Sequence, residues 1–167
     1  MSSFLESLQS LHLLRDAEAA RALLPARDRP EVSLLRLCEA GQLVGGLSVA
    51  LGVRPDELVG PLTLAMGGAA RRLRIVDVRD GVRERPVLQL EVLAGEATEK
   101  WEVEDLHALV HNLNDLYRDA ADVARVAVLG EWEDALQLWC VPRAAVPRLL
   151  REPFFRPQNA RALTTSR

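Results

Sequence analysis

The sequence is poor in aromatic residues and in lysine. Its 167 residues include three Phe, one Tyr and three Trp, and all of these except Phe4 lie beyond residue 100. A buried core must therefore be built mainly from aliphatic side chains. Lys100 is the single lysine, so arginine carries almost all of the positive charge. Codon bias in a GC-rich genome explains this preference, and so does a functional need for arginine at phosphate or carboxylate sites.

Cysteine is also scarce, and the spacing of the two cysteines excludes several kinds of site. Cys38 and Cys140 lie far apart in the sequence and form no CxxC pair. They predict neither a disulfide framework nor a zinc site, and reduced thiols in the cytoplasm are expected. The N-terminal segment carries Glu6 where a signal peptide has positive charge, and its apolar residues are periodic rather than continuous. We expect neither export nor a membrane span.

The composition otherwise fits one globular unit. Apolar residues make up 49% and charged residues 27% of the chain, and the formal net charge is −3. This length accommodates one core more readily than two, and the charge balance is not that of a protein that coats nucleic acid. We predict a single domain over residues 1–152, in which 31–70 is either integral or an insertion. Residues 153–167 form a tail that is flexible or docked on a partner.

Apolar periodicity predicts three helices. Apolar residues recur every three or four positions over residues 3–24, and Pro25 ends the pattern. The same period over residues 103–121, with acidic residues at its start, predicts a second helix. A short closing helix is expected over residues 142–151.

Alternation of polar and apolar residues predicts two hairpins. One joins residues 72–79 to 87–93, and the other joins residues 124–131 to 135–141, each through a polar turn. Hairpins separated by a helix indicate an α+β fold, in which an antiparallel sheet carries helices packed on one face.

The segment between residues 31 and 70 is ambiguous. Strands over residues 32–38 and 43–51 are favoured, but a helix that begins at Pro30 and ends at Gly41 fits the same residues. Farther along, residues 55–57 resemble the first turn of a helix. Gly60-Pro61 is expected to interrupt that helix after a few residues.

His107 and His111 are the most metal-like feature of the sequence. Four residues apart on a helix, two imidazoles project side by side, which suits shared coordination of one metal ion. Glu104 or Asp115 would add an oxygen ligand. Position 108 is alanine, so the glutamate of a metalloprotease motif is missing. Solvated or interface histidines are the favoured interpretation, and a metal-dependent hydrolase that uses both histidines is kept as an alternative.

Other catalytic patterns do not occur in the sequence. It contains no nucleophile-elbow motif, no phosphate-binding P-loop and no dinucleotide-binding glycine fingerprint. Neither cysteine has a histidine near it in the sequence. We therefore expect a binding protein without cofactor rather than an enzyme.

Charge is distributed in opposed blocks. Residues 96–134 hold eleven acidic and three basic residues, whereas residues 135–167 hold six arginines and one glutamate. Such blocks pair within a subunit or across a dimer. The second block also contains a pair of phenylalanines, and exposed aromatic and arginine side chains are typical of interface anchors.

Two surfaces are therefore predicted to contact a partner protein, namely the tail and the flank of the second helix. The residues concerned are Phe154, Phe155, Arg156, His107, His111 and Asn114. A nucleic-acid-binding accessory role is a further alternative, because Arg71, Arg72 and Arg74 form a small basic cluster before a predicted strand.

Residues 103–151 resemble the YbjN-like proteins, whose fold is shared with type III secretion chaperones. The likeness lies in an amphipathic helix that contains Leu113, Asn114 and Tyr117, followed by a strand, an acidic turn, a strand and a closing helix. Residues 40–70 depart from that pattern. The resemblance implies a homodimer without catalytic residues that binds other proteins. The expected function is that of a cytoplasmic chaperone, adaptor or regulator.

Overall fold

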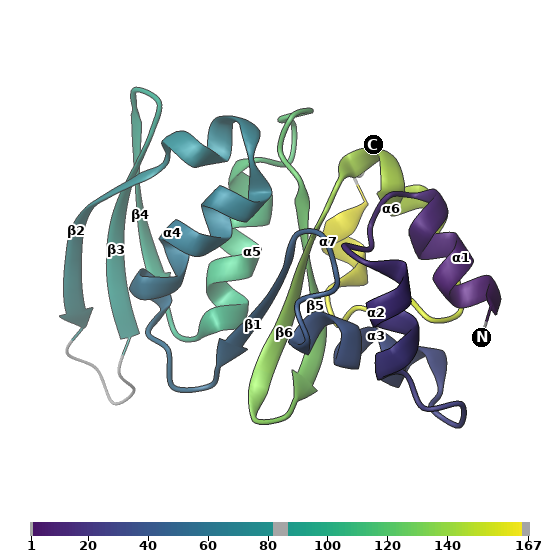
Figure 1. Ribbon diagram of the computed structural model, residues 1–167. Coiled ribbons are helices and arrows are strands. Elements are labelled where there is room, and N and C mark those ends of the chain that lie inside the picture. Colours follow the sequence, from purple (N-terminus) through teal and green to yellow (C-terminus); the bar gives the residue numbers. More distant parts are fainter. Residues whose placement is uncertain (1, 82–86, 165–167) are drawn as a thin grey trace.

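The computed structural model describes residues 2–81 and 87–164 and arranges them in four layers. An outer sheet, a pair of helices, a central sheet and a second group of helices follow one another across the molecule (Figure 1). The fold is α+β, with antiparallel strand pairing throughout and a helix at the N-terminal end, as predicted. The strands divide into two three-stranded sheets, however, where one sheet was expected.

The outer sheet contains β2 (Arg74–Gly81), β3 (Val87–Ala94) and β4 (Ala97–Val103) in that order. The pairing of β2 with β3 confirms the first predicted hairpin. Alternate residues of β3 face the interior and are buried, while the residues between them face outward. The sequence analysis missed β4, because its first four residues are exposed and only Trp101 and Val103 are buried.

Two helices, α4 (Pro55–Met66) and α5 (Leu106–Leu116), fill the space between the sheets. Helix α4 continues through Gly60-Pro61, where an interruption was expected, because its buried face anchors both halves of the helix. Helix α5 is shorter than the predicted 103–121, since Val103 belongs to β4 and the Asp105 side chain accepts a hydrogen bond of 2.8 Å from the Ala108 amide as N-cap.

The central sheet has the order β1-β6-β5, formed by β1 (Gly46–Ala50), β5 (Arg125–Trp132) and β6 (Ala135–Val141). The pairing of β5 with β6 confirms the second predicted hairpin. One face of this sheet joins the core around α4 and α5, and the other face contributes to a second core. Helices therefore cover both faces rather than one, which agrees with the nearly continuous burial along β6.

The second group of helices begins with α1 (Ser2–Ser10) and α2 (Ala17–Leu23), so the helix predicted over residues 3–24 is in fact two helices. His12 adopts a φ of 58°, a left-handed conformation that a right-handed helix does not contain, so the first helix ends before it. Asp16 then caps α2 by accepting hydrogen bonds from the amides of Glu18 and Ala19. Leu14 forms an isolated antiparallel bridge with Leu43, which holds the connection against the rest of the chain.

The strand favoured over residues 32–38 is wrong, because this segment belongs to α3 (Pro30–Glu39). Pro30 occupies the first helical turn, and Leu34, Leu37 and Cys38 form one buried face at helical spacing. The strand favoured over residues 43–51 contains β1 and is confirmed in that part. Together with α4, these elements place residues 31–70 in both cores, so this segment is not a peripheral insertion.

Beyond β6, the chain forms a 3-10 turn η2 (Arg143–Ala145), then α6 (Val146–Leu149) and finally α7 (Ala160–Leu163). Phe154 and Phe155 are both buried in the second core. Their rings make edge-to-face contacts with Phe4 and Trp139, at centroid distances of 4.7 and 5.7 Å. The described part of the predicted tail is therefore integral to the fold.

Within the ranges 2–81 and 87–164, no helix has both the length and the apolar character required to cross a membrane.

Candidate functional site

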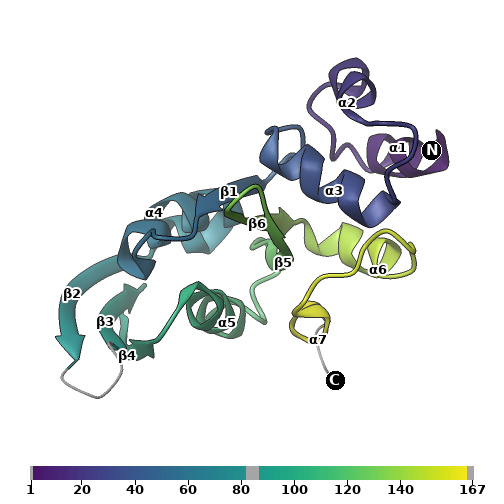
Figure 2. The same ribbon diagram turned by 90° about the horizontal axis from the view of Figure 1, so that it is seen from below.

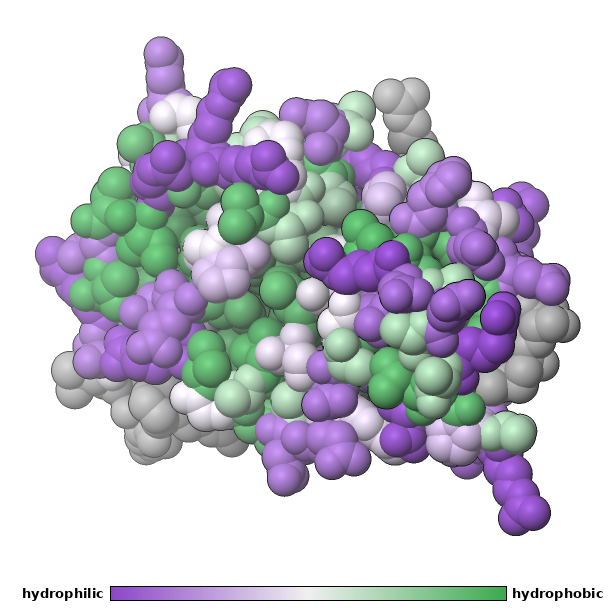
Figure 3. Space-filling model, in the orientation of Figure 1, coloured by the Kyte–Doolittle hydropathy of each residue, from purple (hydrophilic) through white to green (hydrophobic). Residues whose placement is uncertain are grey.

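A groove with a volume of about 700 Å³ lies between the start of β1, the C-terminal half of α4 and the loop that precedes β5. Most of its lining is apolar, and this surface lies on the face of the molecule shown in Figure 3, over α4 and β1. The larger apolar lining residues are Val44, Leu47, Pro61, Leu64, Met66, Val123 and Pro142, and Ala65, Ala121, Ala124 and Ala144 complete the apolar lining together with Cys140.

Two glycines allow the chain to enter β1 at the floor of this groove. Gly45 has a φ of +81°, and a Cβ atom there would lie 2.4 Å from the carbonyl oxygen of Cys140. A Cβ atom on Gly46 would lie 3.1 Å from the Cβ atom of Leu43. Glycine is therefore required at position 45 both for its backbone conformation and for the close approach to β6.

Large apolar side chains in the groove remain exposed to solvent. The exposed fraction is 40% for Val44 and 63% for Leu64, and Leu47 between them is half-buried. Few apolar side chains as large as these are so exposed in the described part of the chain. Removal of apolar area from water is favourable, by about 25 cal/mol per Å² before the costs of association, so this groove favours an apolar occupant.

Strand β1 borders the groove and is an edge strand of the central sheet, since it pairs with β6 alone among the strands that the structure describes. The Cys140 amide donates a hydrogen bond of 2.8 Å to the Gly45 carbonyl. Together with the register, this bond determines which residues of β1 direct their backbone N–H and C=O groups towards β6. Because paired and outward-facing residues alternate in antiparallel strands, the backbone groups of Ser48 point away from β6. The strand carries no charged residue, although natural edge strands are usually protected by charge.

The rim of the groove is predominantly basic. Arg15, Arg71 and Arg143 line it, together with the single carboxylate of Asp122. Arg71 donates a hydrogen bond to the Leu64 carbonyl at 3.3 Å, which holds its side chain beside the apolar lining. A segment with apolar side chains and flanking carboxylates would match both the floor and the rim.

The helix flank predicted to contact a partner is only partly available. His107 and His111 are exposed on α5, and the Nε2 atom of His107 lies 3.2 Å from the Oε1 atom of Gln158. Asn114, by contrast, is buried, and its side chain forms two hydrogen bonds of 2.9 Å with the backbone of Val126. Asn114 therefore joins α5 to β5 and is not a surface contact residue.

The structure also bears on the metal alternative at His107 and His111. Among the described residues, no three His, Cys, Asp or Glu side chains are grouped so that they would hold a metal ion. The third ligand sought from Glu104 or Asp115 is therefore not in place beside the histidines.

The tail anchors and the basic cluster have different environments. Phe154 and Phe155 were predicted to be exposed, and their burial corrects that prediction, whereas Arg156 is exposed. The basic cluster begins in the 3-10 turn η1 (Gly68–Arg72), which contains Arg71 and Arg72, and ends at Arg74, the first residue of β2. Arg74 donates hydrogen bonds of 3.0 Å to the carbonyls of Arg71 and Leu73. Of this cluster, Arg71 reaches the groove.

Arg125 is a buried charge that the sequence analysis did not single out. Its guanidinium donates hydrogen bonds to the carbonyls of Asn114 and Ala162, and Arg143 donates to those of Val123 and Tyr117. Burial, and then the charge of Arg143, lower the pKa of Arg125. Since two of these carbonyls lie at the C-terminal end of α5, the arginines serve as a helix cap and have a structural role.

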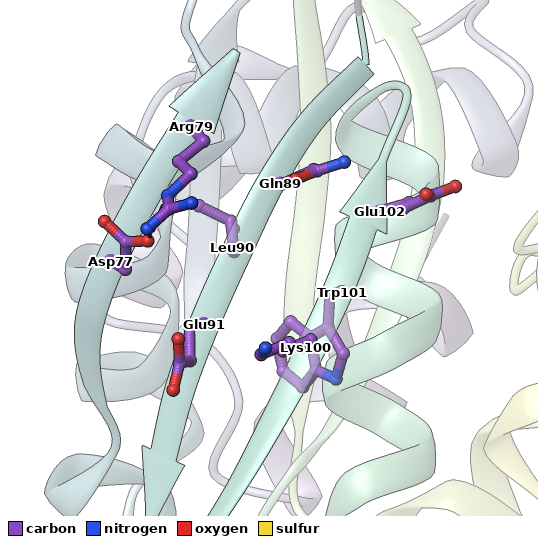
Figure 4. Close-up of a pocket in the computed structure, with 8 residues that line it drawn as sticks. All are labelled: Asp77, Arg79, Gln89, Leu90, Glu91, Lys100, Trp101 and Glu102. Atoms are coloured by element: carbon purple, nitrogen blue, oxygen red, sulfur yellow. Dashed lines mark hydrogen bonds and ion pairs between the residues drawn. The ribbon is translucent and has the colours of Figure 1, made fainter. Parts of the chain in front are cut away.

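The outer sheet carries a second, smaller depression of about 460 Å³ on its outward face (Figure 4). Six polar side chains from three strands surround it, and their charges alternate in sign. They are Asp77, Arg79, Gln89, Glu91, Lys100 and Glu102. Such a mixture does not select one ligand charge, and we regard this face as a solvated surface.

Neither thiol is suited to nucleophilic chemistry. Cys38 and Cys140 are both free and buried. Burial raises the pKa of each thiol to about 12, so both stay protonated near neutral pH. The Cys38 thiol donates a hydrogen bond of 3.3 Å to the Leu138 carbonyl, which is a packing contact within the core.

The fold and the groove together define an α+β protein with an open strand edge beside an apolar surface. Comparison of the chain with protein-family models, with curated proteins and with solved structures gives no match.

Proposed function

We propose that the protein is a non-enzymatic protein-binding module that holds an extended segment of a partner polypeptide in the groove beside β1. The observation that carries this proposal is the position of an uncharged, open strand edge next to an exposed apolar groove. Addition of a strand to an open sheet edge is a recurrent mode of peptide recognition.

The partner segment would lie along the backbone of Ser48 and continue into the groove. Its backbone would pair with the outward-facing N–H and C=O groups of Ser48, which supplies affinity without regard to side chains. Alternate side chains would meet Val44, Leu47 and Leu64, whose exposed area selects apolar residues. An adaptor or a chaperone requires this combination of a general backbone contact and a selective apolar contact.

Acidic residues next to the apolar positions would complete the match. Three arginines against one aspartate give the rim a positive charge. Complementary charge increases the rate of association and excludes wrong partners. The partner chemistry is therefore that of an extended segment in which apolar residues are flanked by aspartate or glutamate.

Selection of peptides from a random 12-residue display library tests this function. The full-length protein is expected to enrich peptides with alternating apolar residues and flanking acidic residues. Fluorescence polarisation with one enriched peptide then compares Ser48→Pro with the matched Ser48→Ala. Both variants lose the Oγ atom that accepts a hydrogen bond from Gln137, and the proline variant also loses the outward-facing N–H group. Leu64→Glu is compared with Leu23→Glu, because Leu23 is an exposed residue outside the groove.

We expect Ser48→Pro and Leu64→Glu to weaken peptide binding by about tenfold or more, which corresponds to about 1.4 kcal/mol, and both controls to retain it. If the enriched peptides bound the Ser48→Pro and Leu64→Glu variants as tightly as they bind the unmodified protein, the groove would not be the binding site. If the library yielded no enriched peptide, the proposed peptide-binding function would be wrong.

The nucleic-acid alternative has weaker support. Arg71 and Arg74 both donate hydrogen bonds to nearby backbone carbonyls, and the cluster is too small for a phosphate-binding surface. The metal-dependent alternative lacks a grouped third ligand among the described residues.

A further inference from the structure

We propose that two copies of the chain associate through the open edge of β2, with Val78 of one copy opposite Val78 of the other. The association joins two outer sheets into one antiparallel six-stranded sheet. It involves a different strand and a different partner from the groove beside β1, so it does not depend on the proposed function.

Strand β2 is an open edge with apolar residues. It is the first strand in the order β2-β3-β4 and pairs with β3 alone among the strands described. Figures 1 and 2 both show it at the outermost side of the molecule, away from every helix except α4. Val76 and Val78 are 52% and 38% exposed there. The strand spans eight residues with a bulge at Val76, and its regular part from Asp77 to Gly81 offers a continuous row of backbone groups around Val78.

The charges of β2 identify a second copy as the occupant. In an antiparallel pair centred on Val78, Asp77 lies opposite Arg79 of the other copy, and the two-fold axis repeats this contact. Centring the pair on Asp77 or on Arg79 instead places two like charges opposite each other. The register centred on Val78 is therefore the one that the charges favour, since opposite charges facing each other across strands are stabilising.

Asp77 and Arg79 are already arranged for this contact. The Nε atom of Arg79 lies 2.7 Å from the Oδ2 atom of Asp77, and both side chains stand on the outward face of the sheet (Figure 4). Two copies would bring together four charges of alternating sign. On the opposite face, Val78 would cover Val78 of the other copy and reduce the exposure of both.

The edge of β1 does not suit a second copy in the same way. Its residues are uncharged, and the neighbouring rim carries three arginines. A two-fold arrangement there would set arginines against arginines. The edge strands β1 and β2 thus have different chemistry, one complementary to an acidic segment and the other complementary to itself.

Sedimentation equilibrium of the full-length protein over a range of concentrations tests the proposal. The variants are Asp77→Arg, Arg79→Asp and the exchanged pair Asp77→Arg/Arg79→Asp. We expect the unmodified protein to dimerise and each single variant to weaken dimerisation by about tenfold or more, because like charges then face each other at two symmetric positions. The exchanged pair restores opposite charges and is expected to restore the dimer.

A mixture of the two single variants gives an independent check. Asp77→Arg carries two positive charges and Arg79→Asp two negative charges, so they should form a heterodimer that native mass spectrometry detects. A damaged fold would not produce this rescue. Monomeric unmodified protein at every concentration would overturn the proposal. A dimer that survives both single variants, or one that Ser48→Pro abolishes, would also overturn it.

Discussion

At the scale of single residues, burial is the largest influence on the chemistry of the two thiols. Cys38 contacts the backbone carbonyls of Leu47 and Leu138, and Cys140 lies near enough to Cys38 for their charges to interact. Desolvation is the main reason that the pKa of each rises to about 12 from an ordinary value of 9.0. The folded protein therefore favours the neutral thiols.

These pKa values predict a loss of stability at alkaline pH. The folded pKa exceeds the unfolded pKa, so the stabilisation is complete below about pH 9 and is lost as the pH rises towards about 12. Within this window the free energy of unfolding should fall by about 1.4 kcal/mol per pH unit for each thiol. Urea denaturation between about pH 8 and pH 11 measures this slope. A Cys38→Ala/Cys140→Ala variant with an equal slope would show that other groups cause it.

Residue roles were the part of the site least accessible from the sequence. Asn114 occupies a helical position that periodicity places on the flank of α5, yet β5 covers that flank and buries the side chain. The sequence suggests that Arg125 is an exposed residue of a strand, yet its guanidinium donates a hydrogen bond to the Asn114 carbonyl and caps the end of α5. In both cases the deciding contact comes from an element that the spacing of residues does not reveal.

At the scale of elements, structure that depends on neighbouring residues was predictable. Both hairpins were predicted because alternation and a polar turn are local signals. Helix α3 was mistaken for a strand because a short apolar run fits either period. Strand β4 was missed because four exposed residues precede its buried end.

The candidate groove was beyond the reach of sequence patterns. Its lining comes from residues 44–47, from 61–66 of α4, from the loop at 121–124 and from 142–144 after β6. None of these segments carries a recognisable motif. They meet only because the central sheet brings the start of β1 beside the end of β6, and that pairing is specified by tertiary packing.

The turn between β5 and β6 offers a prediction at this scale. Glu133 and Asp134 both adopt positive φ, at 53° and 59°, which is the conformation that favours Asn-Gly in a two-residue hairpin. Asp134→Gly should therefore raise the free energy of unfolding by about 0.5–1 kcal/mol, since glycine removes the steric cost of the left-handed conformation. Asp134→Ala keeps that cost and should give no gain in the same urea titration. Equal stability of the two variants would contradict this account.

At the scale of the whole molecule, the central sheet joins two cores. Leu136, Leu138 and Cys140 face the core around α4 and α5, while Trp139 and Val141 face the core that contains α1 and the tail. The two ends of the chain meet in this second core, where Phe4 contacts Phe154. Loss of either core would expose one face of β6, so we expect both cores to unfold in one transition.

The tail provides the decisive test of this cooperativity. Phe155 is 1% exposed and packs against Trp139, so Phe155→Ala should lower the free energy of unfolding by about 3–5 kcal/mol. The exposed neighbour Arg156, changed to alanine, should alter it by less than about 0.5 kcal/mol. Urea denaturation followed by tryptophan fluorescence and by far-ultraviolet circular dichroism should give coincident transitions for both variants. If Phe155→Ala left stability unchanged, the tail would be a detachable arm; if the two probes separated, the cores would fold independently despite their shared sheet.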